Sequence, residues 1–343
     1  MLLKKLTESY GLPGFEDEVR SIIIEELKGH IDSYIIDRMG NLIVTKNKNY
    51  KEKHIALSAH MDEVGFFVKG ITKKGAIKFV PWGVDVRLLP SMHVVIGKNK
   101  IRGVMGTRPI HLQTEENRAK TVKLKDISID IGVTSKEEAE KLVNVGDFIG
   151  FVSDYVEFGE GKIKAKSLDD RAGCACLIEV LKSNIKERVT GIFVVQEEIG
   201  LRGSSAAAYT LLMGDKPSVL INLEATIGAD VSGIDKQLHA TTQGAGPAIS
   251  IMDRTSIYRR AYIDEVVRVA EKKNIPYQFR RSGMGGTDAG SYHSAADGIA
   301  CVNIAVPCRY IHSPVSILTK SDYENYVKLV KEVIEEGNFD EIK

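Results

Sequence analysis

The stretch IALSAHMDEVG, at residues 55–65, joins a short apolar run to a histidine and a carboxylate. The run IALSA is typical of a buried strand, and His60 and Asp62 arrive where that strand should end. Ligands in open α/β sheets bind at the carboxyl ends of the strands. The stretch therefore predicts an α/β sheet with a polar site at one edge.

Apolar strands and helical patterns alternate over two parts of the chain. The predicted strands are a hairpin at 34–46 with its turn at Gly40–Asn41, then 54–59, 190–196, 218–223 and 300–306. The predicted helices are 1–9, 15–28, 169–183, 204–212, 261–274 and 321–336. This alternation indicates a mixed α/β sheet that helices cover on both faces.

The sequence changes character from about residue 68 to about residue 162. Short β-rich pieces such as GAIKFVPWG, at 75–83, alternate there with Gly, Pro and charged turns, and one short helix is predicted at 135–143. This pattern is typical of a small β-barrel or sandwich. We therefore predict one α/β domain, residues 1–67 and 163–343, into which a β-rich domain, residues 68–162, is inserted.

Composition excludes several classes of function. The 343 residues carry 47 Lys and Arg against 46 Asp and Glu, so no basic excess points to nucleic acid or to a membrane surface. No apolar run approaches the roughly 20 residues that a membrane-spanning helix needs. The N-terminus turns polar at Lys4, unlike a signal peptide. The four cysteines form no CxxC pair, so we expect reduced thiols and a cytoplasmic protein.

Histidines and carboxylates follow five of the predicted segments. Besides His60 and Asp62, they are Glu197 and Glu198 after 190–196, Glu224 after 218–223, Asp169 and Asp170 after KIKAKSL at 162–168, and His312 beyond 300–306. So much charge cannot be buried unpaired, and a divalent metal is its natural counter-charge. Imidazole nitrogen and carboxylate oxygen suit Zn²⁺, Co²⁺ or Mn²⁺, and the number of donors suits two metals that share one carboxylate.

Six motifs in this order, AHMDEVG, KSLDDRAG, QEEIGLRG, INLEAT, GGTDAG and RYIHSPV, resemble the tetrahedral (TET) metallo-aminopeptidase family. That family includes glutamyl and deblocking aminopeptidases and members catalogued as "cellulase M". The resemblance extends to IRGVMGTRPIHL in the insert and so covers essentially the whole chain. It implies a zinc-exopeptidase-like sheet with an inserted β-barrel for dimerisation, and self-association from dimers to a dodecamer. It also implies hydrolysis of N-terminal residues from short peptides, with two Zn²⁺ or Co²⁺ ions per subunit.

The resemblance also implies a role for each candidate residue. His60 and Glu224 would bind the first metal, Glu198 and His312 the second, and Asp169 would bridge both, while Glu197 would be general base and acid and Asp62 would orient the His60 ring. Both acids can face the site only if the backbone bends after Gln196, because successive strand residues point opposite ways. This chain departs from the family pattern at Glu224, where Asp is frequent, and at Ser167, where Ala is common.

Simpler interpretations exist for several of these residues. His60 alone would suit a core histidine, Glu197–Glu198 a solvated turn, and Asp169–Asp170 a helix N-terminus, where Asp170 is expected to cap the helix or hold Arg171. His111 is either structural or a residue that reaches an active site, in a neighbouring subunit for instance. The segment 283–290 is expected to form a substrate-side loop that brings Thr287 and Asp288 near the site. Structural roles are expected for His30, His54, His93, His239 and His293.

Three other functions compete with an aminopeptidase. In a related-clan deacylase or carboxypeptidase the bridging Asp follows the first His by a few tens of residues, whereas about a hundred separate His60 from Asp169. A glycosidase needs two carboxyl groups roughly 5 to 9.5 Å apart, which leaves both histidines unexplained. Carbohydrate clefts are also usually lined with aromatics, and this chain has one Trp. An inactive metal-binding scaffold would not need Glu197 as a spare base.

Overall fold

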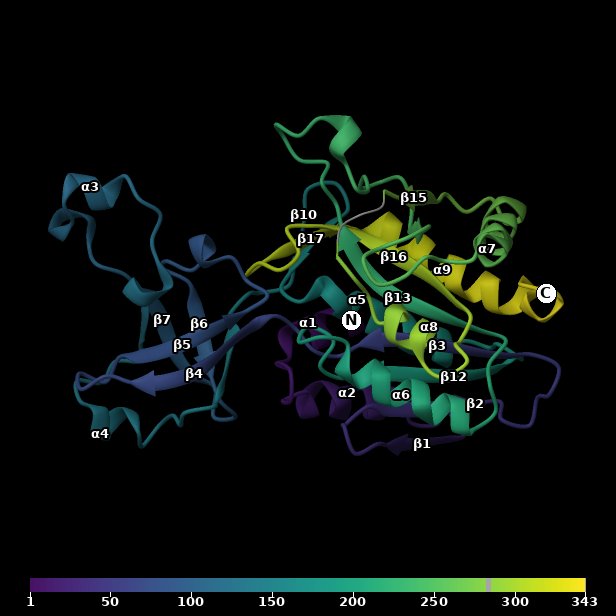
Figure 1. Cartoon of the computed structure of the whole chain (residues 1–343), viewed down its shortest axis with the longest axis horizontal. Coiled ribbons are helices and arrows are strands. Elements are labelled where there is room, and N and C mark those ends of the chain that lie inside the picture. Colours follow the sequence, from purple (N-terminus) through teal and green to yellow (C-terminus); the bar gives the residue numbers. More distant parts are fainter. Residues whose placement is uncertain (282–284, 343) are drawn as a thin grey trace. The chain divides into compact units, whose positions relative to one another are not determined.

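The computed structural model describes residues 1–281 and 285–342, and it divides into two compact units. The first unit consists of Met1–Glu63, Tyr155–Ile311 and Ser316–Lys343, and the second of Val64–Asp154 and His312–Val315. Figure 1 shows the large sheet with its helices in the first unit and the β-rich second unit.

A large mixed sheet forms the centre of the first unit. Its strands, in spatial order, are β1 (Ser33–Ile36), β2 (Leu42–Lys46), β12 (Arg188–Val194), β3 (His54–His60), β13 (Val219–Ile227), β16 (Cys301–Arg309), β17 (Ser316–Thr319), β11 (Lys162–Ala165) and β10 (Val156–Phe158). Two short strands, β14 (Ala248–Ser250) and β15 (Gln278–Arg280), branch from β16. The four central strands β12, β3, β13 and β16 are parallel, so their carboxyl ends lie at one edge.

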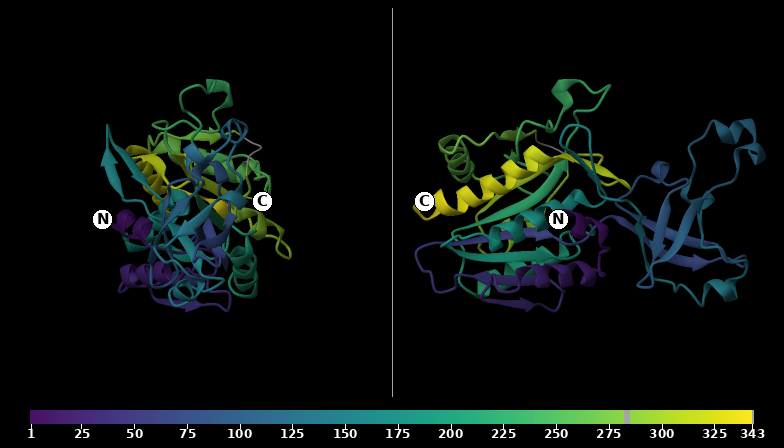
Figure 2. Two further views of the ribbon diagram at one scale, coloured as in Figure 1. Left: turned by 90° about the vertical axis from the view of Figure 1, so that its left-hand side faces the viewer. Right: turned by 180° about the vertical axis from the view of Figure 1, so that it is seen from behind.

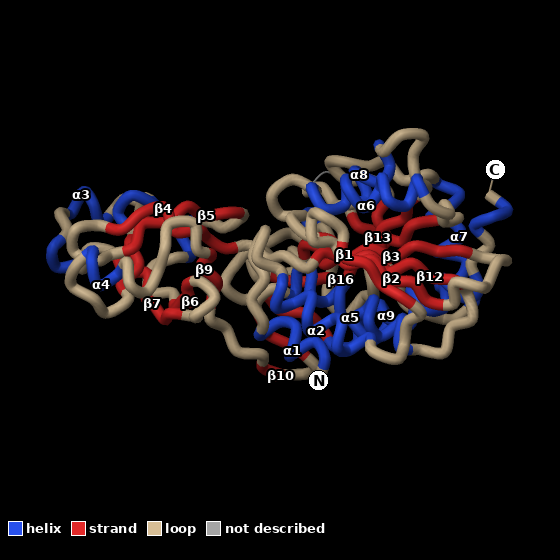
Figure 3. Tube along the Cα trace, turned by 90° about the horizontal axis from the view of Figure 1, so that it is seen from below, coloured by secondary structure: helices blue, strands red, loops and turns tan. Residues whose placement is uncertain are grey.

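Helices cover both faces of this sheet, as the sequence predicts. They are α1 (Leu2–Glu8), α2 (Asp17–Leu27), α5 (Leu168–Lys182), α6 (Arg202–Met213), α7 (Arg260–Lys272), α8 (Ala289–Ser294) and α9 (Lys320–Glu336). Helices α1, α2, α5 and α9 lie against one face, and α6 and α8 against the other (Figure 3). The long α9 runs along the strands (Figure 2).

Helix α5 is the central helix of the core. Most of its residues are buried, because it packs against β3, β13 and α9. Leu177 and Ile178 of α5 are fully buried, as are Leu57 and Leu220 of the neighbouring strands. Burying a side chain of this size stabilises the fold by about 1.5–3 kcal/mol. The helix whose first turn carries Asp169 is therefore held firmly against the strand that carries His60.

The second unit is a closed β-barrel. Its strands, in order around the barrel, are β4 (Gly65–Ile71), β5 (Ile77–Trp82), β8 (Ser128–Asp130), β7 (Ile101–Gly106), β6 (His93–Ile96) and β9 (Phe148–Phe151). Two short helices, α3 (Glu115–Arg118) and α4 (Lys136–Ala139), lie between its strands in sequence. Phe66 fills the interior, where its ring contacts those of Phe79 and Phe151 edge-on at 5.2 and 5.1 Å. The predicted mixed sheet with an inserted β-barrel is therefore confirmed.

The limits of the two units differ from the predicted limits at residues 67/68 and 162/163. Strand β4 begins at Gly65, so the change of character at residue 68 falls inside a continuous strand. Strand β10 pairs with β11 and therefore belongs to the large sheet rather than to the barrel. The four short strands β10, β14, β15 and β17 carry too few residues for a clear alternation and were not predicted.

Two predictions from composition can also be compared with the structure. Cys174, Cys176, Cys301 and Cys308 are all free and buried, as expected. Among residues 1–281 and 285–342, no helix combines the length and apolar character that crossing a membrane requires.

Candidate metal centre

The parallel strands bring four predicted residues to one place. β12 and β3 pair in register, with Val194 beside His60, so the turn that carries Glu197 and Glu198 begins next to the end of β3. β13 pairs with the other side of β3 and carries Glu224. Residues far apart in sequence therefore meet because neighbouring parallel strands end at the same edge.

The sequence predicts that Glu224 follows its strand, but Glu224 lies inside β13. The residues Ala-Thr-Ile continue the strand to Ile227, beyond the apolar run from which its end was predicted. Asn222 is two residues earlier and shares the same face of the strand. Its Nδ2 donates to Glu224 Oε1 at 3.3 Å and to Asn303 Oδ1 at 2.9 Å. Asn222 is the second residue of the motif INLEAT, but nothing in the sequence indicates that it holds one oxygen of the Glu224 carboxylate.

His60 is the centre of the cluster and is almost fully buried. Its Nε2 lies 3.2 Å from Asp169 Oδ1 and 3.8 Å from Glu224 Oε2. On the other side of the ring, Nδ1 lies 3.1 Å from the main-chain oxygen of Asp62. A hydrogen on Nδ1, donated to that oxygen, leaves Nε2 free to bind a metal.

The Asp62 carboxylate holds the turn that follows β12. Its Oδ1 accepts the N–H of Glu197 at 2.9 Å, and its Oδ2 accepts the N–H of Glu198 at 3.0 Å. Gln196 just before them has a φ of 56°, so the backbone does bend where the sequence requires it. The Asp62 carboxylate is farther from the ring, at 3.6 Å from His60 Nδ1. Asp62 thus contacts the ring mainly through its backbone and shapes the acidic turn through its side chain.

Asp169 occupies the irregular first turn of α5. Ser167 before it is left-handed, with a φ of 55°, and Asp169 itself departs from helical geometry. Asp170 accepts the N–H of Gly173 at 2.9 Å and the N–H of His60 at 3.2 Å. Asp170 therefore caps the helix and anchors the end of β3. It does not hold Arg171, whose guanidinium contacts Glu63 instead.

The protonation equilibria of the cluster reflect its excess of negative charge. Burial, together with neighbouring carboxylates, raises the pKa of Glu224 and of Glu197 well above the usual value. Burial on its own lowers the pKa of His60, but Asp169 and the other carboxylates outweigh it and raise that pKa well above its usual value. A divalent cation would relieve this repulsion.

The donor atoms fit a metal. His60, Asp169 and Glu224 each offer one ligand atom within 4.8 Å of the others, and so do His60, Glu197 and Glu198. One imidazole nitrogen with carboxylate oxygens is a donor set that Zn²⁺ and Co²⁺ accept. The described residues can therefore hold a divalent metal at the carboxyl edge of the sheet.

Four further residues were predicted to lie at or near the site: His312, His111, Thr287 and Asp288. His312 is in the segment His312–Val315 of the second unit, with its Nδ1 3.0 Å from the Gly83 oxygen. His111 is exposed in a 3₁₀ turn, Ile110–Leu112. Thr287 and Asp288 are buried, and burial raises the pKa of Asp288 to about 7. Residues 283 and 284 of the predicted loop lie outside the described residues.

Two buried polar residues support the site through contacts that the sequence does not indicate. Glu16 Oε1 accepts the N–H of Gly14 at 2.8 Å and the N–H of Gln196 at 3.2 Å. Asn41 Oδ1 accepts the N–H of Val195 at 3.0 Å. Both accept hydrogen bonds from the backbone just before Glu197 and Glu198. Because both are distant in sequence from that segment, no local pattern indicates the contact.

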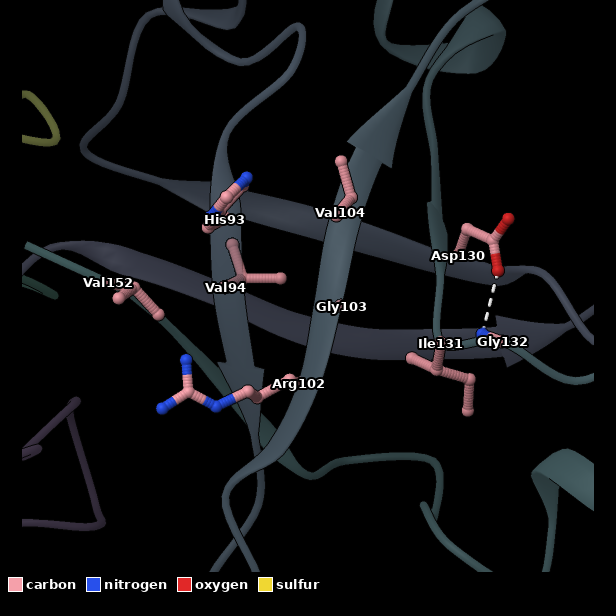
Figure 4. A pocket seen from close by; sticks show the side chains of 9 residues that line it. All are labelled: His93, Val94, Arg102, Gly103, Val104, Asp130, Ile131, Gly132 and Val152. Carbon is pink, nitrogen blue, oxygen red and sulfur yellow. Dashed lines mark hydrogen bonds between the residues drawn. The ribbon is translucent and has the colours of Figure 1, made fainter.

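A pocket on the barrel is separate from these residues (Figure 4). It has a volume of about 490 Å³ and is lined by His93, Val94, Arg102, Gly103, Val104, Asp130, Ile131, Gly132 and Val152. Its one acidic side chain, Asp130, already accepts the N–H of Gly132 at 2.8 Å. None of the residues predicted for the metal site lines it.

A mixed sheet that presents histidine and carboxylates at its parallel edge suits a metal-dependent hydrolase. The family model described as M42 glutamyl aminopeptidase matches residues 40–329. The chain belongs to this family.

Relatives along the full length support the assignment. A putative aminopeptidase of Acetivibrio thermocellus is 38% identical over 97% of each chain. The solved aminopeptidase of Desulfurococcus kamchatkensis superposes with a TM-score of 0.92 at 35% identity, covering 99% of this chain and 95% of the other. The Pyrococcus horikoshii TET peptidase, which can assemble into a tetrahedron or a large octahedral shell, gives a TM-score of 0.86 at 34% identity over 97% and 98%.

The protein is therefore a metal-dependent aminopeptidase, a peptide hydrolase of the exopeptidase class. This finding replaces the competing deacylase, carboxypeptidase, glycosidase and scaffold hypotheses.

Proposed function

We propose that the protein is a dinuclear aminopeptidase that removes N-terminal residues from short peptides. The first metal would be held by His60 and Glu224, the second by Glu198 and His312, and Asp169 would bridge both. The observation that carries this proposal is the approach of Asp169 Oδ1 and Glu224 Oε2 to His60 Nε2, at 3.2 and 3.8 Å. These three donors come from a helix and two strands and converge at one edge of the sheet.

The second metal rests on the family resemblance and on the composition of the site. His312 directly follows Ile311, the last residue of the first unit's segment that contains β16. Its Nδ1 lies 3.0 Å from the Gly83 oxygen, and a hydrogen on Nδ1 would place the ring lone pair on Nε2, the atom that would bind the metal. Zn²⁺ and Co²⁺ are the proposed ions, since both accept nitrogen and carboxylate oxygen.

Glu197 is the proposed general base and acid. When bound, the metals would lower the pKa of a water molecule and polarise the peptide carbonyl. Glu197 takes a proton from the attacking water and returns it to the leaving amine. Burial, together with Asp288, Glu198 and Asp62, raises the pKa of Glu197 well above its usual value. Asp62 fixes the Glu197 backbone during these steps through the 2.9 Å hydrogen bond.

Assembly through the barrel unit is part of the same proposal. The Pyrococcus horikoshii relative forms closed shells, and we propose that this chain dimerises through the barrel and associates further toward a dodecamer. A closed shell would admit only short, unfolded peptides. Sedimentation velocity at micromolar concentration should show a species much larger than a monomer, and a monomer alone would contradict the assembly.

A panel of aminoacyl-anilides tests the activity. Each substrate is offered with a free amine and as its N-acetyl form, to protein loaded with Zn²⁺, with Co²⁺, or treated with a chelator. We expect metal-dependent release of the anilide from free-amine substrates, which also identifies the preferred residue. Equal cleavage of acetylated substrates, or full activity after chelation, would contradict the proposal.

A further inference from the structure

A buried ion cluster lies beside the candidate metal centre. Lys166 Nζ contacts both oxygens of Glu63, at 2.8 and 2.7 Å, and Arg171 Nη2 lies 3.3 Å from Glu63 Oε1. The side chains of Lys166 and Glu63 are each 2% exposed, and that of Arg171 is 0% exposed. Removing one partner of a buried ion pair is costly, because it leaves an uncompensated buried charge. The contacts of this cluster are therefore firmly defined.

The cluster joins the two segments that also meet in the metal centre. Glu63 comes three residues after His60, while Lys166 and Arg171 flank Asp169 on its two sides. Both cations contact the Glu63 carboxylate. Asp169, which lies between them in sequence, contacts His60 Nε2 instead. The ion cluster is thus a second connection between the His60 segment and the Asp169 segment.

The same carboxylate also holds the unusual backbone before Asp169. Ser167 has a φ of 55°, in the left-handed region that costs free energy for a residue other than glycine. The Ser167 hydroxyl donates a hydrogen bond to Glu63 Oε2. This bond links the residue with the left-handed backbone to the cluster.

A third segment completes the cluster. The N–H of Gly11 donates to Glu63 Oε1 at 3.1 Å, and the N–H of Glu63 donates to the Gly11 oxygen at 3.0 Å. Lys166 Nζ also donates to the Ser9 oxygen at 2.7 Å. The segment that follows α1 therefore packs against the cluster. Neither Glu63 nor Lys166 can move without breaking several hydrogen bonds.

We propose that Glu63 and Lys166 are positioning residues for the metal centre. By fixing residues 166–171 against the end of β3, they set the separation of the His60 and Asp169 ligand atoms before a metal arrives. This inference rests on the proposed function, because it assumes that His60 and Asp169 bind a metal. Residues behind metal ligands typically change metal affinity 10- to 100-fold when they are replaced.

Lys166→Met tests the proposal, and Lys46→Met is its matched control. Lys166→Met removes one cation and leaves Glu63 paired with Arg171, so the remaining cluster is neutral. Lys46 is a part-buried lysine that contacts the other end of α5, where its Nζ donates to the oxygens of Leu181 and Ser183 at 2.6 and 2.7 Å. Both variants should lower the melting temperature of the metal-free protein. Only Lys166→Met should weaken metal binding.

The measurement is equilibrium dialysis of the folded full-length chain against Co²⁺, well below each melting temperature. We expect the dissociation constant of Lys166→Met to rise 10- to 100-fold and that of Lys46→Met to stay within twofold of the wild type. Equal binding by Lys166→Met and wild type would overturn the positioning role alone. Absence of Co²⁺ binding by the wild type would overturn the proposed metal centre as well.

Ser167→Ala decides the question if Lys166→Met does not fold. It keeps all three ions and removes only the hydroxyl that holds the left-handed residue to Glu63. A rise of about threefold or more in the Co²⁺ dissociation constant supports the positioning role. Binding equal to that of the wild type overturns it.

Discussion

Asp62 and Glu197 are joined by a 2.9 Å hydrogen bond in which the Glu197 backbone N–H donates to Asp62 Oδ1. The second oxygen of the same carboxylate accepts the N–H of Glu198, and the Asp62 backbone oxygen lies 3.1 Å from His60 Nδ1. One residue therefore contacts the first candidate ligand and shapes the turn that carries the proposed base. This arrangement ties the orientation of the imidazole to the position of the proposed proton-transfer group.

Asp62→Asn should lower kcat about 10- to 100-fold. An asparagine side chain keeps one acceptor oxygen, and its amide nitrogen would face a second N–H donor in the turn, so one of the two hydrogen bonds is lost. Anilide hydrolysis at saturating metal measures the change. Asp322→Asn is the control, since the two oxygens of the Asp322 carboxylate accept the N–H groups of Gly244 and Gly246, at 2.6 and 2.8 Å. That control should lower stability and leave kcat unchanged, and equal activity of the two variants would contradict the role of Asp62.

Glu198→Ala should remove one metal and leave the other. The first-metal donors His60, Asp169 and Glu224 are untouched, whereas the proposed second metal loses one of its carboxylates. Elemental analysis after dialysis at limiting metal should fall from two ions per chain toward one. Retention of two ions, or loss of both, would show that Glu198 does not serve the second metal specifically.

The free energy of unfolding should fall as the pH is lowered from 7 to 4, because His54 is partly buried in its neutral form. Burial first, and then the charge of Arg188, lower the pKa of His54 in the folded protein to about 4. The unfolded chain titrates near the ordinary pKa of about 6.5, so between these values only the unfolded state gains a proton. The stabilisation is present above pH 6.5 and is lost as the pH falls through about 4.

The variant His54→Gln should therefore lose less stability than the wild type between pH 7 and pH 4. Urea unfolding of the metal-free protein at several pH values measures this difference, with His93→Gln, at an exposed position, as the control. Parallel curves for the wild type and His54→Gln would contradict the role of His54.

The sequence predicts the parts of the fold that depend on local pattern. Each long central strand and each long helix of the large sheet was predicted from apolar periodicity, and the residues after β3 and β12 were correctly expected at one edge. Glu224 was misplaced relative to its strand, because β13 continues past the apolar run through Thr226. Strand ends depend on pairing with neighbours, here β16, which a single segment does not encode.

The contacts that support the site were beyond prediction for a different reason. Glu63 appears in the motif AHMDEVG as an ordinary acid, yet it is buried with Lys166, which lies about a hundred residues away. The pairing follows from how α5 meets β3, and no spacing in the sequence reports it. The double role of Asp62 likewise requires the bend at Gln196 to be known.

The hydrolysis rate of metal-loaded Glu197→Gln tests the central claim most directly. Glutamine keeps the size and hydrogen-bonding capacity of the side chain but cannot take a proton from water, so the metals should stay bound while kcat falls by roughly 10²- to 10⁴-fold. Anilide release and elemental analysis are measured on the same sample. The account predicts wild-type metal content with this loss of turnover. Wild-type turnover by metal-loaded Glu197→Gln would contradict it.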